Sequence, residues 1–269
     1  MNDASIGIFD SGMGGLTVMR ALLKRLPNEH FIYLGDTARL PYGTKSGETV
    51  SRYALQAAAA LMQRDVKLLV IACNTASAYA LPALQNTIPS IPVAGVIEPG
   101  ADAACVAAPN GRIAVIATEG TVNGGAYVRA VKQRNPAASV VQKPCPLFVP
   151  LAEEGLTDGE IAAAVAHHYL EPLKAEAPDC LVLGCTHFPV LKKAIREVVG
   201  PEIAIVDSAA TTARAVEAIL ISGDLARDRS AAGERTFLVT DAPERFARVG
   251  KIFLGASIDP AAVELVDLR

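Results

Sequence analysis

The sequence predicts an α/β fold made of two similar, pseudo-symmetric domains with mostly parallel sheets. Strand-like apolar runs alternate with helical stretches along the chain, an order typical of parallel sheets covered by helices. Two of these runs, residues 68–72 and 181–184, are unbroken, as expected for strands buried on both faces. Each is followed by a cysteine, Cys73 or Cys185. Because such sheets bind ligands at the carboxyl ends of their strands, we expect a site at these two thiols.

The first half of the chain opens with a strand that runs into a glycine-rich turn, residues 10–15. The glycines permit a tight turn and expose backbone N–H groups at a helix start, where an anion can bind. Their spacing is neither that of a dinucleotide fingerprint nor that of a P-loop. The expected strands are residues 6–9, 31–35, 68–72 and 93–96, and the expected helices are residues 16–26, 48–64 and 76–85.

The second half repeats this layout, beginning with a strand at residues 112–116 and the polar turn after it. Pairing Ile8 with Val115 gives an offset of 107 residues, and pairing Cys73 with Cys185 gives 112. Two nearly equal offsets indicate an internal repeat, and two units predict two like domains rather than a solenoid. We therefore expect a first domain of residues 1–96 plus 208–269, a second of residues 97–207, and an active site in the cleft between them.

The remaining elements continue the alternation of strands and helices. Thr157-Asp158-Gly159-Glu160 predicts a capping box that opens a helix running to residue 174. Further strands are expected at residues 139–141, 203–206, 236–239 and 263–266, and further helices from residue 190, at 208–221 and at 242–254.

Composition and charge exclude several classes of partner. The net charge of −3 gives no electrostatic reason to bind nucleic acid or an anionic membrane. No apolar run approaches the roughly 20 residues of a membrane span, and no export signal is visible, so we expect a cytoplasmic protein.

The five cysteines do not suggest a disulfide framework, because their number is odd and their spacing wide. No Cys-x-x-Cys pair is present and the histidines are scattered, so no metal site is expected. We expect Cys105, Cys145 and Cys180 to be small buried hydrophobic residues, and His167 and His168 to be structural.

Two thiols at equivalent strand ends of facing domains would lie on opposite sides of the cleft. That arrangement suits inversion at a carbon stereocentre, where one thiolate removes a proton from one face and the other thiol returns a proton to the opposite face. An unperturbed cysteine titrates at about pH 8.5, so modest tuning can make one base and one acid. Asp10 and His187 are the expected tuning residues.

Several ordered motifs surround these residues. They are Ile6-Gly7-Ile8-Phe9-Asp10-Ser11-Gly12-Met13-Gly14-Gly15-Leu16-Thr17-Val18, Asp36-Thr37 with Pro41-Tyr42-Gly43, Ala72-Cys73-Asn74-Thr75-Ala76-Ser77-Ala78, and Gly184-Cys185-Thr186-His187-Phe188-Pro189. Cys145-Pro146 through Gly155 and Val239-Thr240-Asp241 in the tail extend the set over nearly the whole chain. Together these motifs resemble those of bacterial glutamate racemases, in the aspartate/glutamate racemase family.

The resemblance implies cofactor-independent interconversion of L- and D-glutamate, which supplies D-glutamate for peptidoglycan, by an enzyme that is often a homodimer. It assigns the paired acid and base to Cys73 and Cys185, with auxiliary catalytic roles for Asp10 and His187. A further catalytic glutamate of the family maps to Glu153, with the adjacent Glu154 as the alternative. The substrate contacts that it implies are Asp10, Ser11, Tyr42, Gly43, Asn74, Thr75, Thr118, Thr121, Thr186 and His187.

Other interpretations remain open from the residues alone. Cys73 taken singly reads as a buried structural thiol, and Asp10 could cap the helix that follows it. Lys45 raises the possibility of a pyridoxal Schiff base, but no phosphate signature accompanies it, and we expect no cofactor. The same chemistry would serve an aspartate racemase, whereas a non-catalytic amino-acid-binding protein would carry its cysteines incidentally.

Overall fold

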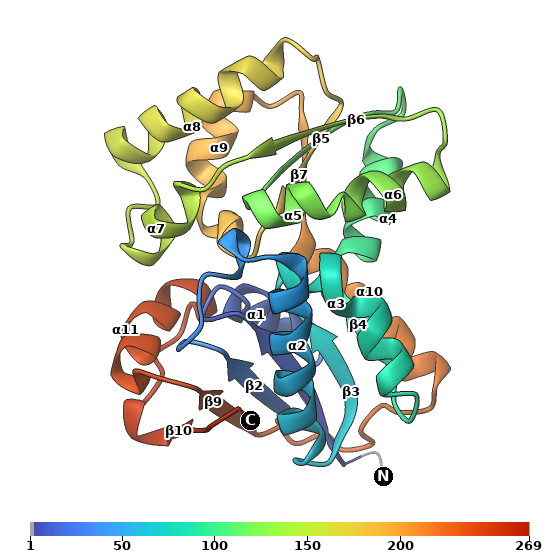
Figure 1. Cartoon of the computed structure of the whole chain (residues 1–269), viewed down its shortest axis with the longest axis vertical. Coiled ribbons are helices and arrows are strands. Elements are labelled where there is room, and N and C mark those ends of the chain that lie inside the picture. The colour runs from blue at the N-terminus through green and yellow to red at the C-terminus, as the bar shows by residue number, and fades with distance from the viewer. Residues whose placement is uncertain (1–2, 269) are drawn as a thin grey trace.

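Two separate parallel sheets organise the chain, one in each lobe of the molecule (Figure 1). This computed structural model describes residues 3–268. The six-stranded sheet has the order β10-β9-β2-β1-β3-β4, and the four-stranded sheet has the order β6-β5-β7-β8. The strands of the first are β1 (Ser5–Asp10), β2 (Phe31–Gly35), β3 (Val66–Ile71), β4 (Val93–Gly95), β9 (Arg235–Val239) and β10 (Val263–Leu265). Those of the second are β5 (Arg112–Ala117), β6 (Ser139–Pro144), β7 (Cys180–Gly184) and β8 (Ala204–Asp207).

The two sheets share one topology, which confirms the predicted α/β fold of two similar units. The order β2-β1-β3-β4 in one sheet corresponds to β6-β5-β7-β8 in the other. In each, the chain first moves to one side of its opening strand and then crosses to the other side. The order in which strands are added to the sheet therefore reverses between β1 and β3, and again between β5 and β7. Such switch points leave a crevice at the carboxyl ends of the strands, where open α/β sheets bind ligands.

Alternate residues of the first sheet serve its two faces. Ile6 and Ile8 of β1 belong to the core beneath α1 (Leu16–Arg25) and α11 (Pro243–Leu254). Phe9 points to the opposite core, against α2 (Gly47–Met62) and α3 (Asn74–Thr87). This alternation follows from the two-residue period of a strand.

The second sheet is likewise covered on both faces, with α8 and α9 on one side and α5 and α6 on the other (Figure 1). Within the described residues, no helix combines the length and hydropathy needed to cross a bilayer. The remaining helices are α4 (Ile97–Ala107), α5 (Glu119–Gly124), α6 (Ala126–Arg134), α7 (Phe148–Glu153), α8 (Gly159–Lys174), α9 (Lys192–Val199) and α10 (Ser208–Ser222), with short 3₁₀ turns η1 (Tyr42–Thr44), η2 (Phe188–Leu191) and η3 (Pro260–Ala262).

Three local expectations were wrong. The capping box before α8 does not form: Asp158 is the N-cap without a side-chain capping bond, and Gly159 has φ +81°. Helix α3 begins at Asn74, directly after Cys73, because the cysteine sulfur itself caps the helix. Cys145 and Cys180 are buried as expected, but Cys105 on α4 is only partly buried, since it packs at the margin of the core.

Truncating the fully buried Leu69 tests the two-faced packing of β3. Leu69→Ala should lower the free energy of unfolding by about 2–5 kcal/mol, because the cavity adds to the lost apolar burial. Leu265→Ala, at a side chain that is 62% exposed, is the matched control and should change it by about 0.5 kcal/mol or less. Denaturant unfolding measures both, and equal losses would contradict the assigned packing.

Candidate active site

A small cavity of about 30 Å³ is lined by both strand-end cysteines. Its walls come from the segments that follow β1 and β3 in one sheet and β5 and β7 in the other. Both switch points therefore open onto the same space. The lining residues are Ser11, Pro41, Tyr42, Gly43, Cys73, Asn74, Thr75, Thr118, Thr121, Val149, Cys185, Thr186 and His187.

Cys73 lies at the start of α3, where it has two weak polar contacts. The parallel register that pairs Phe9 with Ile71 brings Ser11 beside Cys73, and the sulfur lies 3.6 Å from Ser11 Oγ. The same sulfur accepts the Ala76 N–H at 3.4 Å. Burial and the negative charge of Asp10 raise the pKa of the Cys73 thiol to about 12, although both polar contacts oppose the shift. At neutral pH Cys73 is therefore a thiol.

Cys185 is the first member of a chain of polar side chains. Its sulfur lies 3.8 Å from His187 Nδ1, and His187 Nε2 lies 3.2 Å from Glu153 Oε1. Arg245 Nη2 donates to the other oxygen of Glu153 at 2.8 Å. Each group thus has an oppositely charged or hydrogen-bonding neighbour in a largely buried place, as buried charge requires.

The contacts along this row of polar side chains set the protonation of His187 and Glu153. Burial alone would lower the pKa of His187, but the contacts with Cys185 and Glu153 outweigh it and raise the pKa to about 10. Burial alone would raise the pKa of Glu153, but hydrogen bonds from His187 and Arg245 hold it below its usual value. Near neutral pH His187 is therefore an imidazolium that lies between the Glu153 carboxylate and the Cys185 sulfur.

Asp10 does not line the cavity, and it does not cap the following helix, whose N-cap is Gly15. Its Oδ2 accepts the Gly12 N–H at 3.0 Å, whereas the buried Oδ1 has no hydrogen-bond partner among residues 3–268. Burial raises the pKa of Asp10, although the positive charge of His187 and nearby backbone N–H groups oppose the shift.

Three hydroxyls join the two halves on the other side of the cavity. Thr75 lies 2.9 Å from Thr118 and 3.0 Å from Thr121, oxygen to oxygen. Beside them, Asn74 Oδ1 accepts from Tyr127, which leaves the buried Asn74 Nδ2 without a partner in the described structure. The cavity is thus bordered by hydroxyls and an unsatisfied amide donor.

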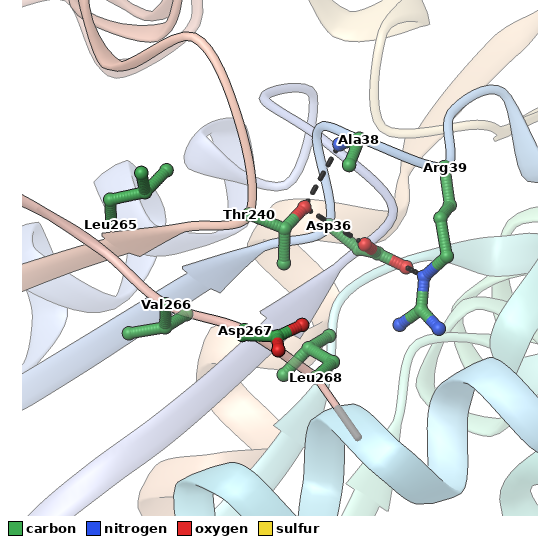
Figure 2. A pocket seen from close by; sticks show the side chains of 8 residues that line it. All are labelled: Asp36, Ala38, Arg39, Thr240, Leu265, Val266, Asp267 and Leu268. Carbon is green, nitrogen blue, oxygen red and sulfur yellow. Dashed lines mark hydrogen bonds and ion pairs between the residues drawn. The ribbon is translucent and has the colours of Figure 1, made fainter.

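The loop that supplies Tyr42 and Gly43 is held by the buried carboxylate of Asp36. The Tyr42 hydroxyl and Arg39 Nε both donate to Asp36 Oδ2. Thr240 donates to Oδ1 at 3.0 Å and accepts the Ala38 N–H at 2.9 Å (Figure 2). Because its hydroxyl is hydrogen-bonded to Asp36, the Tyr42 side chain is held in place where it borders the cavity.

The glycine turn after β1 packs directly on His187. A Cβ added to Gly14 would lie 2.4 Å from the imidazole Nδ1, closer than any side chain tolerates, so this position requires glycine. Thr17, on α1, also donates to the Thr186 carbonyl at 2.9 Å. These contacts fix the Cys185 segment against the first sheet.

The structure brings most of the sequence-predicted site residues to the cavity wall. The exceptions are Asp10 and Glu153, which do not line it, although Glu153 reaches His187. Its neighbour Glu154 is exposed, so the geometry favours Glu153 of the two candidates. The sequence interpretation missed Pro41, Val149 and Arg245, because no local pattern marks a residue whose role comes from a distant contact.

Two features bear on a cofactor or a metal. Lys45, the lysine considered for a pyridoxal Schiff base, does not line it. Across residues 3–268, no three His, Cys, Asp or Glu side chains are grouped in a way that could hold a metal ion.

Comparisons with known proteins agree with one another. The family model for Asp/Glu/hydantoin racemases matches residues 6–216. The glutamate racemase of Geobacter metallireducens is 56% identical over 254 residues, 94% of either chain. The structure of Francisella tularensis glutamate racemase in complex with D-glutamate superposes with a TM-score of 0.93 and 37% identity, covering 100% of this chain and 99% of that one. Picrophilus torridus aspartate racemase shares the fold alone, with 16% identity, a TM-score of 0.56, and coverage of 82% and 95%.

The pKa of His187 tests the proposed protonation directly. Imidazole NMR of nitrogen-labelled protein should show His187 protonated up to about pH 10. Glu153→Gln should lower that pKa, because the carboxylate that stabilises the imidazolium is removed. Glu154→Gln is the control, since that exposed neighbour should leave the titration unchanged. A wild-type His187 that titrates near its ordinary value would contradict the described chain.

Glu153→Gln should also lower the free energy of unfolding, and the size of this loss should depend on pH. A raised folded-state pKa stabilises the protein below the unfolded value of about 6.5, and the contribution disappears as pH rises through about 10. The loss of unfolding free energy caused by Glu153→Gln should therefore be largest at about pH 6 and shrink toward pH 10. Denaturant unfolding at several pH values measures it, and a pH-independent loss would contradict the linkage.

Proposed function

The chain belongs to the Asp/Glu/hydantoin racemase family, and from that premise we propose that it interconverts L- and D-glutamate by a two-base mechanism using Cys73 and Cys185. The enzyme is a racemase and thus an isomerase. The observation that carries the proposed mechanism is that two thiols from separate sheets line one cavity. We propose further that it needs no cofactor and supplies D-glutamate for peptidoglycan.

Inversion at the α-carbon needs a proton removed from one face and another delivered to the opposite face. In one direction the Cys185 thiolate takes the α-proton and the Cys73 thiol gives its proton to the carbanion. In the other direction the two sulfurs exchange roles. Each turnover therefore moves one proton from carbon to sulfur and another from sulfur to carbon, so no net proton is consumed.

The unequal surroundings of the thiols support a specific resting state. Cys73 has the negatively charged Asp10 nearby, and its raised pKa keeps the proton on sulfur. Cys185 has the His187 imidazolium beside it, which can donate to a sulfur anion. We therefore assign Cys73 as the thiol that donates its proton when Cys185 acts as the base.

Two unsatisfied polar atoms support the binding of an amino acid. Asn74 Nδ2, on the cavity wall, is a donor suited to a carboxylate, and Asp10 Oδ1, which does not line the cavity in this conformation, is an acceptor suited to the substrate ammonium. Ammonium bound at Asp10 would also neutralise the charge that disfavours a thiolate at Cys73. The hydroxyls of Thr75, Thr118 and Thr121 would donate to a second carboxylate, which glutamate provides.

The described conformation is too closed to hold the substrate. A cavity of about 30 Å³ holds only about two or three water molecules, whereas glutamate has ten heavy atoms. We propose that the two lobes separate to admit the substrate and that their return excludes water from the carbanion. The sequence resemblance also implies a cytoplasmic location and a homodimer, and we propose both. Sedimentation of the purified protein would test the homodimer.

Incubation with each glutamate enantiomer in heavy water tests the reaction. We expect deuterium at the α-carbon together with appearance of the other enantiomer. Cys73→Ala and Cys185→Ala should each lower the racemisation rate at least about 100-fold, the typical weight of a positioned acid or base. Cys105→Ala, a cysteine outside the cavity, is the matched control and should keep full activity.

Three results would overturn the proposal. Full turnover by either cavity-thiol variant would exclude the two-base mechanism. Faster racemisation of aspartate than of glutamate would assign a different substrate. Binding of glutamate without α-hydrogen exchange would indicate an amino-acid-binding protein.

A further inference from the structure

Arg245 joins the two lobes at the far end of the polar chain that begins with Cys185. It lies on α11, which packs on the first sheet, whereas Glu153 ends α7 in the other lobe; the two helices face each other in Figure 1. The 2.8 Å ion pair between Arg245 and Glu153 therefore crosses the boundary between the lobes. The second Arg245 nitrogen, Nη1, lies 3.8 Å from the sulfur of Met13.

This ion pair is more sheltered than an ordinary surface pair. The Glu153 side chain is only 13% exposed, and that of Arg245 is 38% exposed. Arg245 and His187 are the two charged groups that act on Glu153, and each binds a different carboxylate oxygen. Two-point attachment fixes the carboxylate plane, which orients the imidazole toward Cys185.

Helix α11 also contacts the imidazole directly. The Phe253 ring meets the His187 ring edge to face, with centroids 5.0 Å apart. One helix of the first lobe thus holds His187 through a ring contact and, by way of Arg245, through Glu153. Separation of the lobes would remove both of these supports of His187 together.

We propose that Arg245 is a positioning residue that couples closure of the lobes to the placement of His187 beside the Cys185 sulfur. With the lobes closed, Arg245 keeps Glu153 ionised and aimed at His187, so the imidazolium stands beside the Cys185 sulfur. With the lobes open, the ion pair between Arg245 and Glu153 is broken, and the imidazolium is no longer held beside the Cys185 sulfur. The inference rests on the proposed racemase function and adds a residue that touches neither substrate nor thiol.

Arg245→Met keeps most of the apolar stem and removes the charge. The kcat for glutamate racemisation should fall about 10- to 100-fold, the range found when the outer-shell partner of a metal-bound histidine is lost. Arg245→Lys should recover part of the loss. Arg248→Met is the matched control, because Arg248 is exposed on the same helix, and it should keep the wild-type rate.

A structural role alone would not move the pH dependence. Without its cation Glu153 binds a proton more readily, so the acid limb of the kcat–pH profile should shift to higher pH in Arg245→Met, with Arg245→Lys between. The isotope effect from α-deuterated substrate should rise more in the direction in which Cys185 takes the proton than in the other. Denaturant unfolding would confirm that the variants are folded.

The Glu153 carboxyl itself provides a readout that does not depend on activity. In protein with carbon-labelled glutamate side chains, its NMR signal is identified by its loss in Glu153→Gln. That signal should titrate at higher pH in Arg245→Met than in wild type. An unmoved titration or acid limb, or an equal loss in Arg248→Met, would overturn the role of Arg245. Failure of wild type to exchange the α-hydrogen of glutamate would instead overturn the proposed function.

Discussion

The site depends on the pairing of buried charge around His187. His187 carries a positive charge in a place that burial alone would make neutral, and it does so because Glu153 and Cys185 lie on either side of it. Removing one partner of such a group leaves an uncompensated charge, which is far more destabilising than the pair is stabilising. Other contacts hold this arrangement: Gly14 packs against the imidazole, and Thr17 binds the Thr186 carbonyl.

The repeated strand order places equivalent segments on opposite sides of one cavity, but their chemistry differs. Cys73 follows β3 and has an acidic neighbour, whereas Cys185 follows β7 and has a basic one. A symmetric frame thus places the two thiols in unlike electrostatic surroundings. The proposed two-base mechanism needs one acid and one base at any moment, and the raised pKa of Cys73 favours that thiol as the acid before substrate arrives.

In the proposed mechanism, closure of the lobes and catalysis depend on the same contacts. The hydroxyls of Thr75 and Thr121 join the lobes on one side of the cavity, and the Glu153–Arg245 ion pair joins them on another. Both sets are polar contacts between side chains of the two lobes. A large apolar junction at these points would keep the cavity too small for an amino acid.

The sequence by itself determined the α/β class, the repeat, and the two cysteines at strand ends, because unbroken apolar runs and turn residues are local features. The resemblance to racemases added Glu153, and only its contact with His187 separates it from Glu154. Only the tertiary structure brought in Arg245, 92 positions away from Glu153 along the chain. Only it revealed that the Cys73 sulfur caps its own helix. The physical reason is that strand periodicity is encoded within a few residues, whereas an ion pair between lobes exists only once both have folded and docked.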